Sequence, residues 1–270
     1  MTPQLTIVPI GGLCNRFRVA LSAFHLAPEL PLPIRVEWGS DSDCHAFFDE
    51  LFLPLEGRNF ALGRRRFLNA YSTRCNLKLP GLLRMPFYDL QNEGFNPLKE
   101  GSLQHLVRQR QRVYIATGYA LCDYPTRLIN LLQPVPDIAD SIKGITDSFH
   151  GPTVGVHIRR TDHKQAIAHS SDEAFIKAME QEIEQKQDVR FYLATDDPIL
   201  KKRLTERFGK RIIQQDTPCN RNSLSGIRGA VVDLYALAST QKILGSYYSS
   251  FSGTAAEFRD IPLHTIGEEM

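Results

Sequence analysis

Short apolar runs of strand character alternate with longer amphipathic patterns along the whole chain, and this alternation limits the possible folds more than any other feature. We predict strands at 4–10, 34–38, 112–116, 153–156, 189–194, 211–214 and 243–247. We predict helices over 13–27, 125–132, 137–147, 198–208 and 229–241, with further helices after Ser170 and Ser249. Strands separated by helices pair in parallel through crossover connections. The pattern therefore predicts an α/β protein built from two Rossmann-like halves with a cleft between them.

The segment His150-Gly151-Pro152 is the best boundary between these halves, because it follows a helical pattern and precedes a regular series of strands and helices. We therefore expect domains over 1–150 and 151–270. Residues 55–100 are rich in Arg, Gly, Pro and Asn and show weak periodicity. We expect them to form irregular loops of the kind that recognise acceptors. Ser170 and Glu173 have the spacing of a capping box, which predicts that a helix begins there.

Composition excludes several classes of protein. A net charge of +2 over 270 residues argues against bulk nucleic-acid binding. The five cysteines are odd in number and lack metal-ligand spacing, which favours reduced thiols and a cytoplasmic protein. No apolar run is long enough for a membrane span, and no signal peptide is recognisable. The basic runs at 64–66 and 201–203 allow peripheral membrane contact, although solvated faces are the commoner explanation.

The strand expected at 153–156 leads into His157-Ile158-Arg159-Arg160-Thr161-Asp162. Two adjacent guanidiniums at the carboxyl end of a buried strand are costly unless an anion meets them there. Ligands of open α/β sheets bind at this end, and guanidinium groups match phosphate oxygens. A ligand that carries phosphate is one interpretation. An exposed basic turn that pairs with Asp162 is the other.

Two loops of the first half carry possible ligand-binding residues. Gly11-Gly12 joins the first strand to the first helix, a layout that brings backbone N–H groups close to a ligand, but it lacks the spacing of known phosphate loops. A tight turn without a ligand is the alternative. Asp41-Ser42-Asp43 offers two carboxylates that suit Mg²⁺ or Mn²⁺ with a diphosphate, and its residues are also common in plain turns.

Four segments resemble the fucosyltransferase superfamily, which includes the α1,2-, α1,6- and protein-O-fucosyltransferases and nodulation relatives. Residues 11–17 (GGLCNRF) are similar to the family's N-terminal glycine turn, and residues 157–162 resemble its HxRRxD element. Residues 192–198 (YLATDDP) resemble the α1,6 branch, and residues 233–251 resemble the nucleotide-binding motif near the C-terminus. Gly118-Tyr119 is similar to a stretch of the α1,2 branch. The matches occur in the family's order and span nearly the whole chain.

This resemblance implies a GT-B fold and a metal-independent, inverting transfer of fucose from GDP-fucose to a hydroxyl of a glycan or glycoconjugate. It implies that residues 1–150 form the acceptor side and that residues 151–270 bind the GDP-sugar. It implies that Arg159 contacts the β-phosphate and stabilises departing GDP, and that His157 lies near the guanine or ribose. It implies that Asp233 accepts the guanine N1 and amine protons. The other expected donor-binding residues are Arg160, Asp197, Ser249, Ser250, Phe251, Asn15 and Gly12. No cofactor and no metal ligand are expected.

Alternatives remain for several of these residues. Arg160 equally suits pairing with Asp162 or Asp197, and of Asp196 and Asp197 we expect one helix cap and one donor-site carboxylate. Capping alone also explains the two serines at 249–250.

The chain also departs from the family's pattern. Cys14 and Arg16 replace the family's usual glycine and glutamine, and residues 163–167 do not reproduce the α1,6 branch or its proposed catalytic glutamate. Asp41, Asp43 and Glu93 are therefore only weak candidates for the base. A transferase that uses another GDP-sugar, and a nucleotide-binding protein without catalysis, are the alternative functions.

Overall fold

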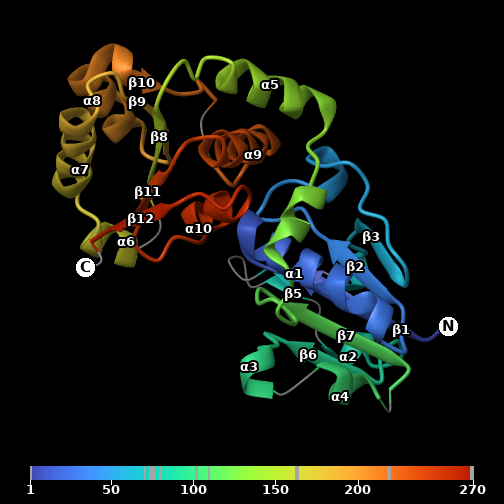
Figure 1. Cartoon of the computed structure of the whole chain (residues 1–270). Coiled ribbons are helices and arrows are strands. Elements are labelled where there is room, and N and C mark those ends of the chain that lie inside the picture. Colours follow the sequence, from blue (N-terminus) through green and yellow to red (C-terminus); the bar gives the residue numbers. More distant parts are fainter. Residues whose placement is uncertain are drawn as a thin grey trace. The chain divides into compact units, whose positions relative to one another are not determined.

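The computed structural model describes residues 2–69, 71–72, 77–78, 81–100, 103–108, 110–161, 164–217 and 220–267. The chain divides into two compact units, residues 1–135 with 221–227, and residues 136–220 with 228–270. Each unit contains a five-stranded sheet whose neighbouring strands are all parallel, which confirms the predicted α/β class (Figure 1). The expected assignment of 1–150 to the acceptor and 151–270 to the donor stays a prediction, as does the cleft between the halves.

The N-terminal sheet has the strand order β3-β2-β1-β7-β6. Its elements are β1 (Gln4–Pro9), α1 (Leu13–Leu26), β2 (Ile34–Trp38), β3 (Phe60–Arg64), α2 (Gly81–Arg84), β6 (Leu90–Glu93), α3 (Pro97–Glu100), α4 (Leu103–Val107) and β7 (Arg112–Thr117). A small antiparallel pair, β4 (Tyr71–Ser72) and β5 (Leu77–Lys78), lies outside this sheet. Short 3-10 helices occupy Ala27–Glu29, Phe48–Glu50, Phe67–Asn69 and Thr126–Leu131.

The C-terminal sheet has the strand order β10-β9-β8-β11-β12. Its elements are α5 (Pro136–Thr146), β8 (Thr153–Ile158), α6 (Lys164–His169), α7 (Asp172–Gln185), β9 (Arg190–Thr195), α8 (Pro198–Phe208), a 3-10 helix (Gly209–Arg211), β10 (Ile212–Ile213), α9 (Leu224–Ala238), β11 (Ile243–Ser246), α10 (Ser250–Glu257) and β12 (Leu263–Ile266). Counted along the chain this order is 3-2-1-4-5, as in doubly wound nucleotide-binding folds, so the direction of winding reverses between β8 and β11.

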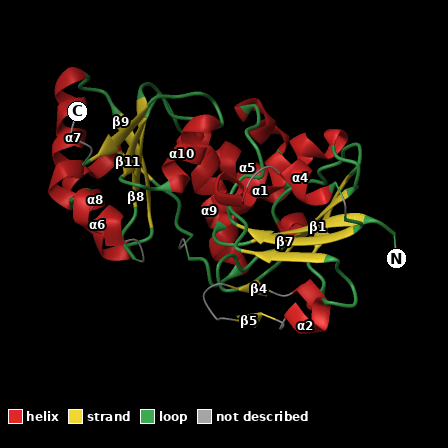
Figure 2. Ribbon diagram, turned by 90° about the horizontal axis from the view of Figure 1, so that it is seen from below, coloured by secondary structure: helices red, strands yellow, loops and turns green. Residues whose placement is uncertain are grey.

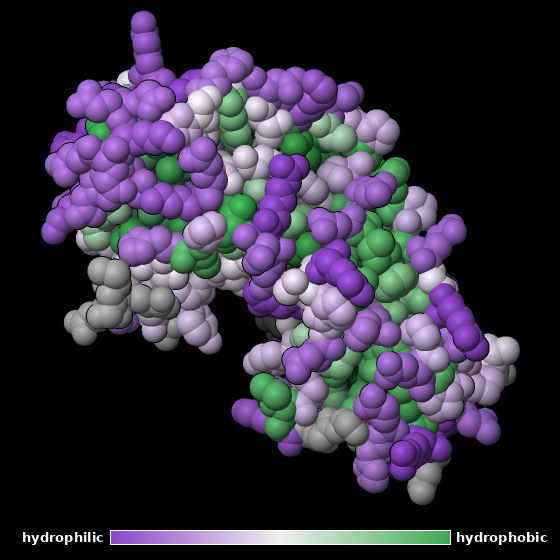
Figure 3. Space-filling view, in the orientation of Figure 1, coloured by the Kyte–Doolittle hydropathy of each residue, from purple (hydrophilic) through white to green (hydrophobic). Residues whose placement is uncertain are grey.

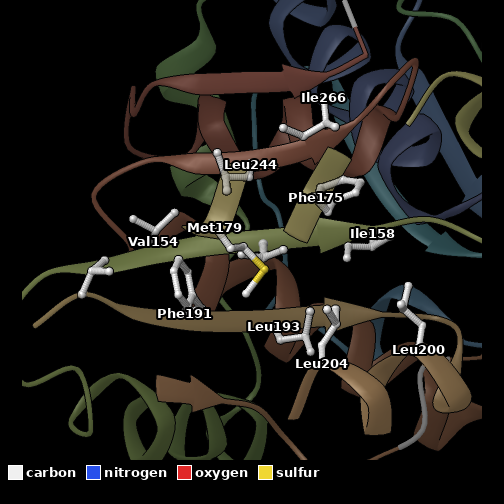
Figure 4. Packing of buried hydrophobic residues seen from close by; sticks show 12 residues of the cluster. Val154, Ile158, Phe175, Met179, Phe191, Leu193, Leu200, Leu204, Leu244 and Ile266 are labelled. Atoms are coloured by element: carbon white, nitrogen blue, oxygen red, sulfur yellow. The ribbon is translucent and has the colours of Figure 1, made fainter. Parts of the chain in front are cut away.

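The two faces of β8 explain why helices cover this sheet on both sides. Val154, Val156 and Ile158 pack into a buried cluster with side chains of α7 and α8 (Figure 4). A Cβ at Gly155, on the opposite face, would lie 2.9 Å from Leu237 of α9, so only glycine allows this close packing. Figure 2 shows α7 and α8 on one side of the sheet and α9 and α10 on the other. The alternation of β8 therefore builds a three-layer unit.

Helix α7 is amphipathic because only one stripe of it meets the core. Among its side chains Phe175 and Met179 are buried, and the face of α7 and α8 that Figure 3 shows is mostly hydrophilic. Ser171, rather than Ser170, caps α7, since its side chain accepts a hydrogen bond from Ala174 N. Ser170 instead donates through Oγ to Ile266 O at 2.6 Å. The expected capping box is therefore wrong by one residue, because tertiary contacts bind Ser170.

Several predicted boundaries are corrected. Residues 55–100 contain the sheet strands β3 and β6, which periodicity missed because both are edge strands with half-exposed side chains. Strand β12 follows the expected last strand and was missed for the same reason. Helix α9 begins at Leu224, before the predicted 229, and residues 126–131 form a 3-10 helix. Among the described helices, none combines the length and apolar character needed to cross a bilayer.

Candidate active site

The candidate site lies where β8 and β11 of the C-terminal unit end side by side. The two strands pair in parallel, with His157 opposite Gly245. The backbone N–H of Arg159 donates to Ser246 Oγ at 2.9 Å, and Ser246 Oγ donates to His157 O at 3.4 Å. The end of β8 is therefore fastened to the end of β11. Ligands of doubly wound sheets bind outside the strands at this point of reversal.

His157 joins β8 to helix α10. The side chain is buried, its Nδ1 lies 2.7 Å from Ser252 Oγ, and its ring stacks on Phe251 with 4.7 Å between ring centroids. Burial first, and then the Arg159 cation, lower the pKa of His157 against the opposing effect of Asp196, and the resulting pKa is about 3. The imidazole is neutral at physiological pH, so it adds no charge to the site. The contacts of His157 with Phe251 and Ser252 hold the first turn of α10 against the strand.

Arg159 is partly open to solvent at the carboxyl end of β8. Its side chain is 23% exposed, and its Nε lies 3.4 Å from Asp196 Oδ2. Asp196 also accepts hydrogen bonds from Arg160 N at 2.7 Å and Thr161 Oγ1 at 2.7 Å. Asp196 thus shapes the loop after β8 and orients the guanidinium. A cation held this way is suited to meet an anionic ligand.

Arg160 points into the protein. It binds Asp172 (Nη2 to Oδ1, 2.7 Å) and donates to Ser170 O at 2.7 Å, with the guanidinium 5.8 Å from the centroid of the Phe175 ring. The pairing with Asp197 that the sequence suggested is therefore wrong, and Asp162 lies outside the described residues. These bonds anchor the start of α7 to the arginine loop. A direct contact between Arg160 and the donor stays a prediction. The bonds to Asp172 and Ser170 already explain where the Arg160 side chain lies.

Asp196 and Asp197 divide two roles between them. Asp197 caps α8, since its Oδ1 accepts from Ile199 N at 2.8 Å and from Leu200 N at 3.2 Å. Asp196 is the carboxylate that faces Arg159. We expected one cap and one site carboxylate but assigned the donor role to Asp197. Capping explains where Asp197 lies, and its donor role stays a prediction.

The first turn of α10 faces the same end of the sheet. Ser249 is its N-cap residue, and the Ser249 side chain makes no capping hydrogen bond. Ser249, Ser250 and Phe251 are half-buried. Tyr248, just before them, has a φ of 54°, unusual for a residue with a bulky side chain. The expected helix entry at 249–251 is confirmed, and a helix N-terminus favours an anion through its N–H groups and dipole.

Asp233 lies on α9 and is 3% exposed. Tyr192, on β9, donates to its Oδ1 at 2.6 Å. The hydrogen bond holds the carboxylate in a fixed orientation inside the C-terminal unit. The guanine contact expected of Asp233 stays a prediction.

Gly12 and Asn15 lie at the start of α1 in the N-terminal unit, where Gly12 is the N-cap residue. Gly11 has a φ of 80°, and a Cβ there would lie 2.9 Å from Asn15 Nδ2. Arg16 is fully buried and donates from Nε to Gly11 O at 2.7 Å. The arginine that departs from the family's pattern therefore braces the glycine turn. Donor contacts of Gly12 and Asn15 stay predictions.

Asp41 and Glu93, two of the three carboxylates considered for a metal or a base, have cationic partners. Asp41 lies between Arg16 (Nη2 to Oδ1, 2.6 Å) and Arg65 (Nη1 to Oδ2, 2.9 Å). Glu93 forms an ion pair with Arg84, and Asp43 is buried. In the described part of the chain, no group of three or more His, Cys, Asp or Glu side chains gathers as a metal site.

Sequence reasoning missed the residues that hold the site together, namely Ser246, Ser252 and Tyr192. Ser246 ends an apolar strand, and a polar residue at that position is a weak signal for a ligand-facing edge. Tyr192 and Ser252 gave no comparable signal. Tyr192 lies in a buried strand and Ser252 near the start of a helix, where tyrosine and serine are common without any ligand.

Comparison with known proteins matches residues 127–258 to the family model described as alpha-(1,6)-fucosyltransferase N- and catalytic domains. The fold is similar to fucosyltransferase NodZ from Bradyrhizobium, with a TM-score of 0.63, 16% identity, and coverage of 94% of this chain and 93% of that one. It is also similar to apo POFUT1, with a TM-score of 0.60, 11% identity and 99% of both chains covered. NodZ soaked with GDP-fucose matches with a TM-score of 0.61, 17% identity, and coverage of 95% of this chain and 92% of that one.

These likenesses confirm the GT-B-like α/β fold class. The matched residues 127–258 include β8, β11 and the start of α10, and so contain the geometry described above. The sequence match and the shared fold together relate this chain to the fucosyltransferase superfamily.

Proposed function

We propose that this protein is a GDP-fucose-dependent glycosyltransferase that moves fucose to a hydroxyl of a glycan or glycoconjugate. The observation that carries the proposal is that Arg159, just past the end of β8, is bonded through its backbone N–H to Ser246 at the end of β11, and that Ser249, the N-cap residue of α10, follows Ser246 closely in the chain. One cation and one helix N-terminus at this edge suit the two phosphates of a nucleoside diphosphate. The match of residues 127–258 to α1,6-fucosyltransferases supports fucose as the sugar.

In the proposed reaction the acceptor oxygen forms a bond to the anomeric carbon of fucose while the bond from that carbon to the β-phosphate oxygen breaks. This single displacement inverts the anomeric configuration. GDP leaves with the bonding electrons, and the hydroxyl proton passes to the departing phosphate or to a carboxylate. Arg159 and the N–H groups of α10 stabilise the negative charge that develops on the leaving group.

This assignment gives the leaving group its charge stabilisation without a divalent metal. Asp41, the carboxylate that first suggested a metal, is already paired with Arg16 and Arg65. A metal held there would have to displace two guanidiniums. We therefore propose metal-independent transfer, and full activity in excess EDTA is the expected result.

Neutral His157 and buried Asp233 suit recognition of the nucleoside. A neutral imidazole that stacks on Phe251 adds no positive charge beside the guanidinium of Arg159. A carboxylate accepts hydrogen bonds from guanine N1–H and the exocyclic amine, which adenine does not offer in that arrangement. Calorimetry should therefore show clear binding of GDP and much weaker binding of ADP. Equal affinities would contradict the role of Asp233.

The decisive test is donor turnover with a panel of acceptors, read by mass spectrometry, for the wild type and Arg159→Ala. Loss of one charge-stabilising group predicts a decrease of about 100-fold or more in kcat/KM. Arg207→Ala is the matched control, because Arg207 is exposed on α8 and pairs with Glu180. A rate for Arg159→Ala within a few-fold of the wild type would reject the assignment. GDP binding without turnover of any donor would favour the non-catalytic alternative, and turnover of a different GDP-sugar would correct the sugar.

A further inference from the structure

A cavity with charged and amide side chains in its lining lies in the N-terminal unit, outside the candidate donor site. It has a volume of about 420 Å³ and is lined by Gly81, Arg84, Met85, Gln91 and Glu93. Gln91 and Glu93 belong to strand β6, and Arg84 ends helix α2. Its volume falls within the range of pockets that hold small molecules.

Arg84 is the central residue of this cavity. The side chain is fully buried, its Nε donates to Gln91 Oε1 at 3.0 Å, and its Nη2 forms an ion pair with Glu93. The guanidinium carbon lies 4.2 Å from the centroid of the Tyr114 ring. The charges of Arg84 and Glu93 compensate each other. The cavity therefore offers oriented hydrogen-bonding groups without a net charge.

Two buried polar atoms at this place have no partner. Among the residues that the structure describes, Arg84 Nη1 and the Tyr114 hydroxyl are buried without a hydrogen bond. Buried polar groups are normally satisfied, and each exception calls for a cause, such as a ligand that is absent. Tyr88 provides the contrast in the same cluster. Its ring is 5.4 Å from that of Tyr114, but its hydroxyl exchanges hydrogen bonds with Asn69.

The cavity lies close to the ligand-binding edge of its sheet. Gln91 of β6 pairs with Tyr114 of β7, and Glu93 is the last residue of β6. The carboxyl ends of parallel strands are where α/β sheets bind ligands. Met85, which forms part of the wall, is 62% exposed, so a flexible side chain borders the cavity at the protein surface.

We infer that this cavity binds one neutral sugar ring of the acceptor, an inference that rests on the proposed transferase function. A sugar ring presents several hydroxyls that both donate and accept, which matches a guanidinium, a carboxylate, an amide and a phenol. An anion would meet an arginine that Glu93 already neutralises. An apolar ligand would leave Arg84 Nη1 and the Tyr114 hydroxyl unpaired. A ligand hydroxyl can bind these two atoms only if the side chains that bury them move on binding.

The test compares Tyr114→Phe with Tyr88→Phe in the full chain. D-glucose, D-galactose and N-acetyl-D-glucosamine are titrated separately at millimolar concentration and followed by ligand-observed NMR, with sodium sulfate as an anionic probe. We expect at least one sugar to bind the wild type, and Tyr114→Phe to weaken that binding about 3- to 10-fold, the effect of one hydrogen bond. Tyr88→Phe should leave sugar affinity unchanged, although it removes a satisfied buried hydroxyl and lowers the Tm.

The unliganded stability of the two variants gives a second readout. Tyr114→Phe removes a hydroxyl that has no partner, so its Tm should equal or exceed that of the wild type, while its sugar affinity falls. Sugar binding that is equal in Tyr114→Phe and the wild type would overturn the inference, as would binding of sulfate in place of the sugars, or no binding of any sugar. GDP titrations of the same proteins, run in parallel, show whether a failure concerns the donor site or only the acceptor cavity. If GDP fails to bind, the proposed function fails, whereas loss of sugar binding with GDP binding intact refutes only the acceptor cavity.

Discussion

The neutral state of His157 leads to a quantitative prediction about how the stability of the protein depends on pH. The folded protein holds this imidazole with a pKa of about 3 because it is buried and lies beside Arg159. In the unfolded chain an ordinary histidine has a pKa of about 6.5. Between these two values the unfolded state binds a proton that the folded state does not. His157 therefore has almost no pH-dependent effect on the free energy of unfolding well above pH 6.5, and it lowers this free energy progressively as the pH falls below that value.

The magnitude follows from the two pKa values. At pH 5, about 1.5 units below the unfolded pKa, the loss is about 2 kcal/mol at 1.36 kcal/mol per unit. At pH 7.5 protonation of His157 in the unfolded chain changes the free energy of unfolding very little. His157→Asn removes the titrating ring and keeps polar atoms that can reach Ser252 Oγ. The variant should be less stable than the wild type at pH 7.5, because the stacking on Phe251 is lost, yet its stability should decline less on acidification.

Urea unfolding at pH 7.5, 6 and 5 provides the measurement. The difference in unfolding free energy between pH 7.5 and pH 5 should be about 2 kcal/mol smaller for His157→Asn than for the wild type. His264→Asn, at an exposed position on β12, controls for the loss of an imidazole in general. Equal pH dependence in the wild type and His157→Asn would refute the reasoning, because it would mean that the folded protein protonates His157 as readily as the unfolded chain does.

Two further predictions concern the caps and turns that frame the site. Asp197→Ala should lower the free energy of unfolding in urea by about 1 kcal/mol, because it removes the cap of α8. The GDP affinity measured by calorimetry should stay unchanged. A large loss of GDP affinity at unchanged stability would instead support the donor role of Asp197. Gly11→Ala should destabilise by about 1–2 kcal/mol because of its φ of 80°, whereas Gly12→Ser meets open space and supplies a capping oxygen, so it should gain a few tenths of a kcal/mol. Thermal unfolding of Gly11→Ala and Gly12→Ser tests this prediction. Equal Tm values for the two variants would contradict strain at Gly11.

Local patterns in the sequence were sufficient for the central strands and for the class of fold. The strand at Ile34–Trp38 was predicted with its observed bounds, and β8 and β9 were predicted within two residues, because their buried positions carry apolar residues, many of them β-branched or aromatic. The edge strands β3, β6 and β12 were missed. Their side chains are half-exposed, and their strand character comes from hydrogen bonds to a neighbour that a local pattern does not contain.

The sequence by itself determined where cationic and hydroxyl side chains stand at the ends of strands and helices, with Arg159 where a strand meets a loop and the serines at 249–250 where a loop meets a helix. Only the tertiary structure decided how neighbouring residues of the same type divide their roles. Arg159 faces Asp196 at the strand end while Arg160 turns to Asp172, and Asp197 caps a helix while Asp196 orients an arginine. The partners of Arg159 and Arg160 lie 12 to 87 positions away along the chain. Packing of the whole unit brings these residues together, and no local stretch of sequence contains that information.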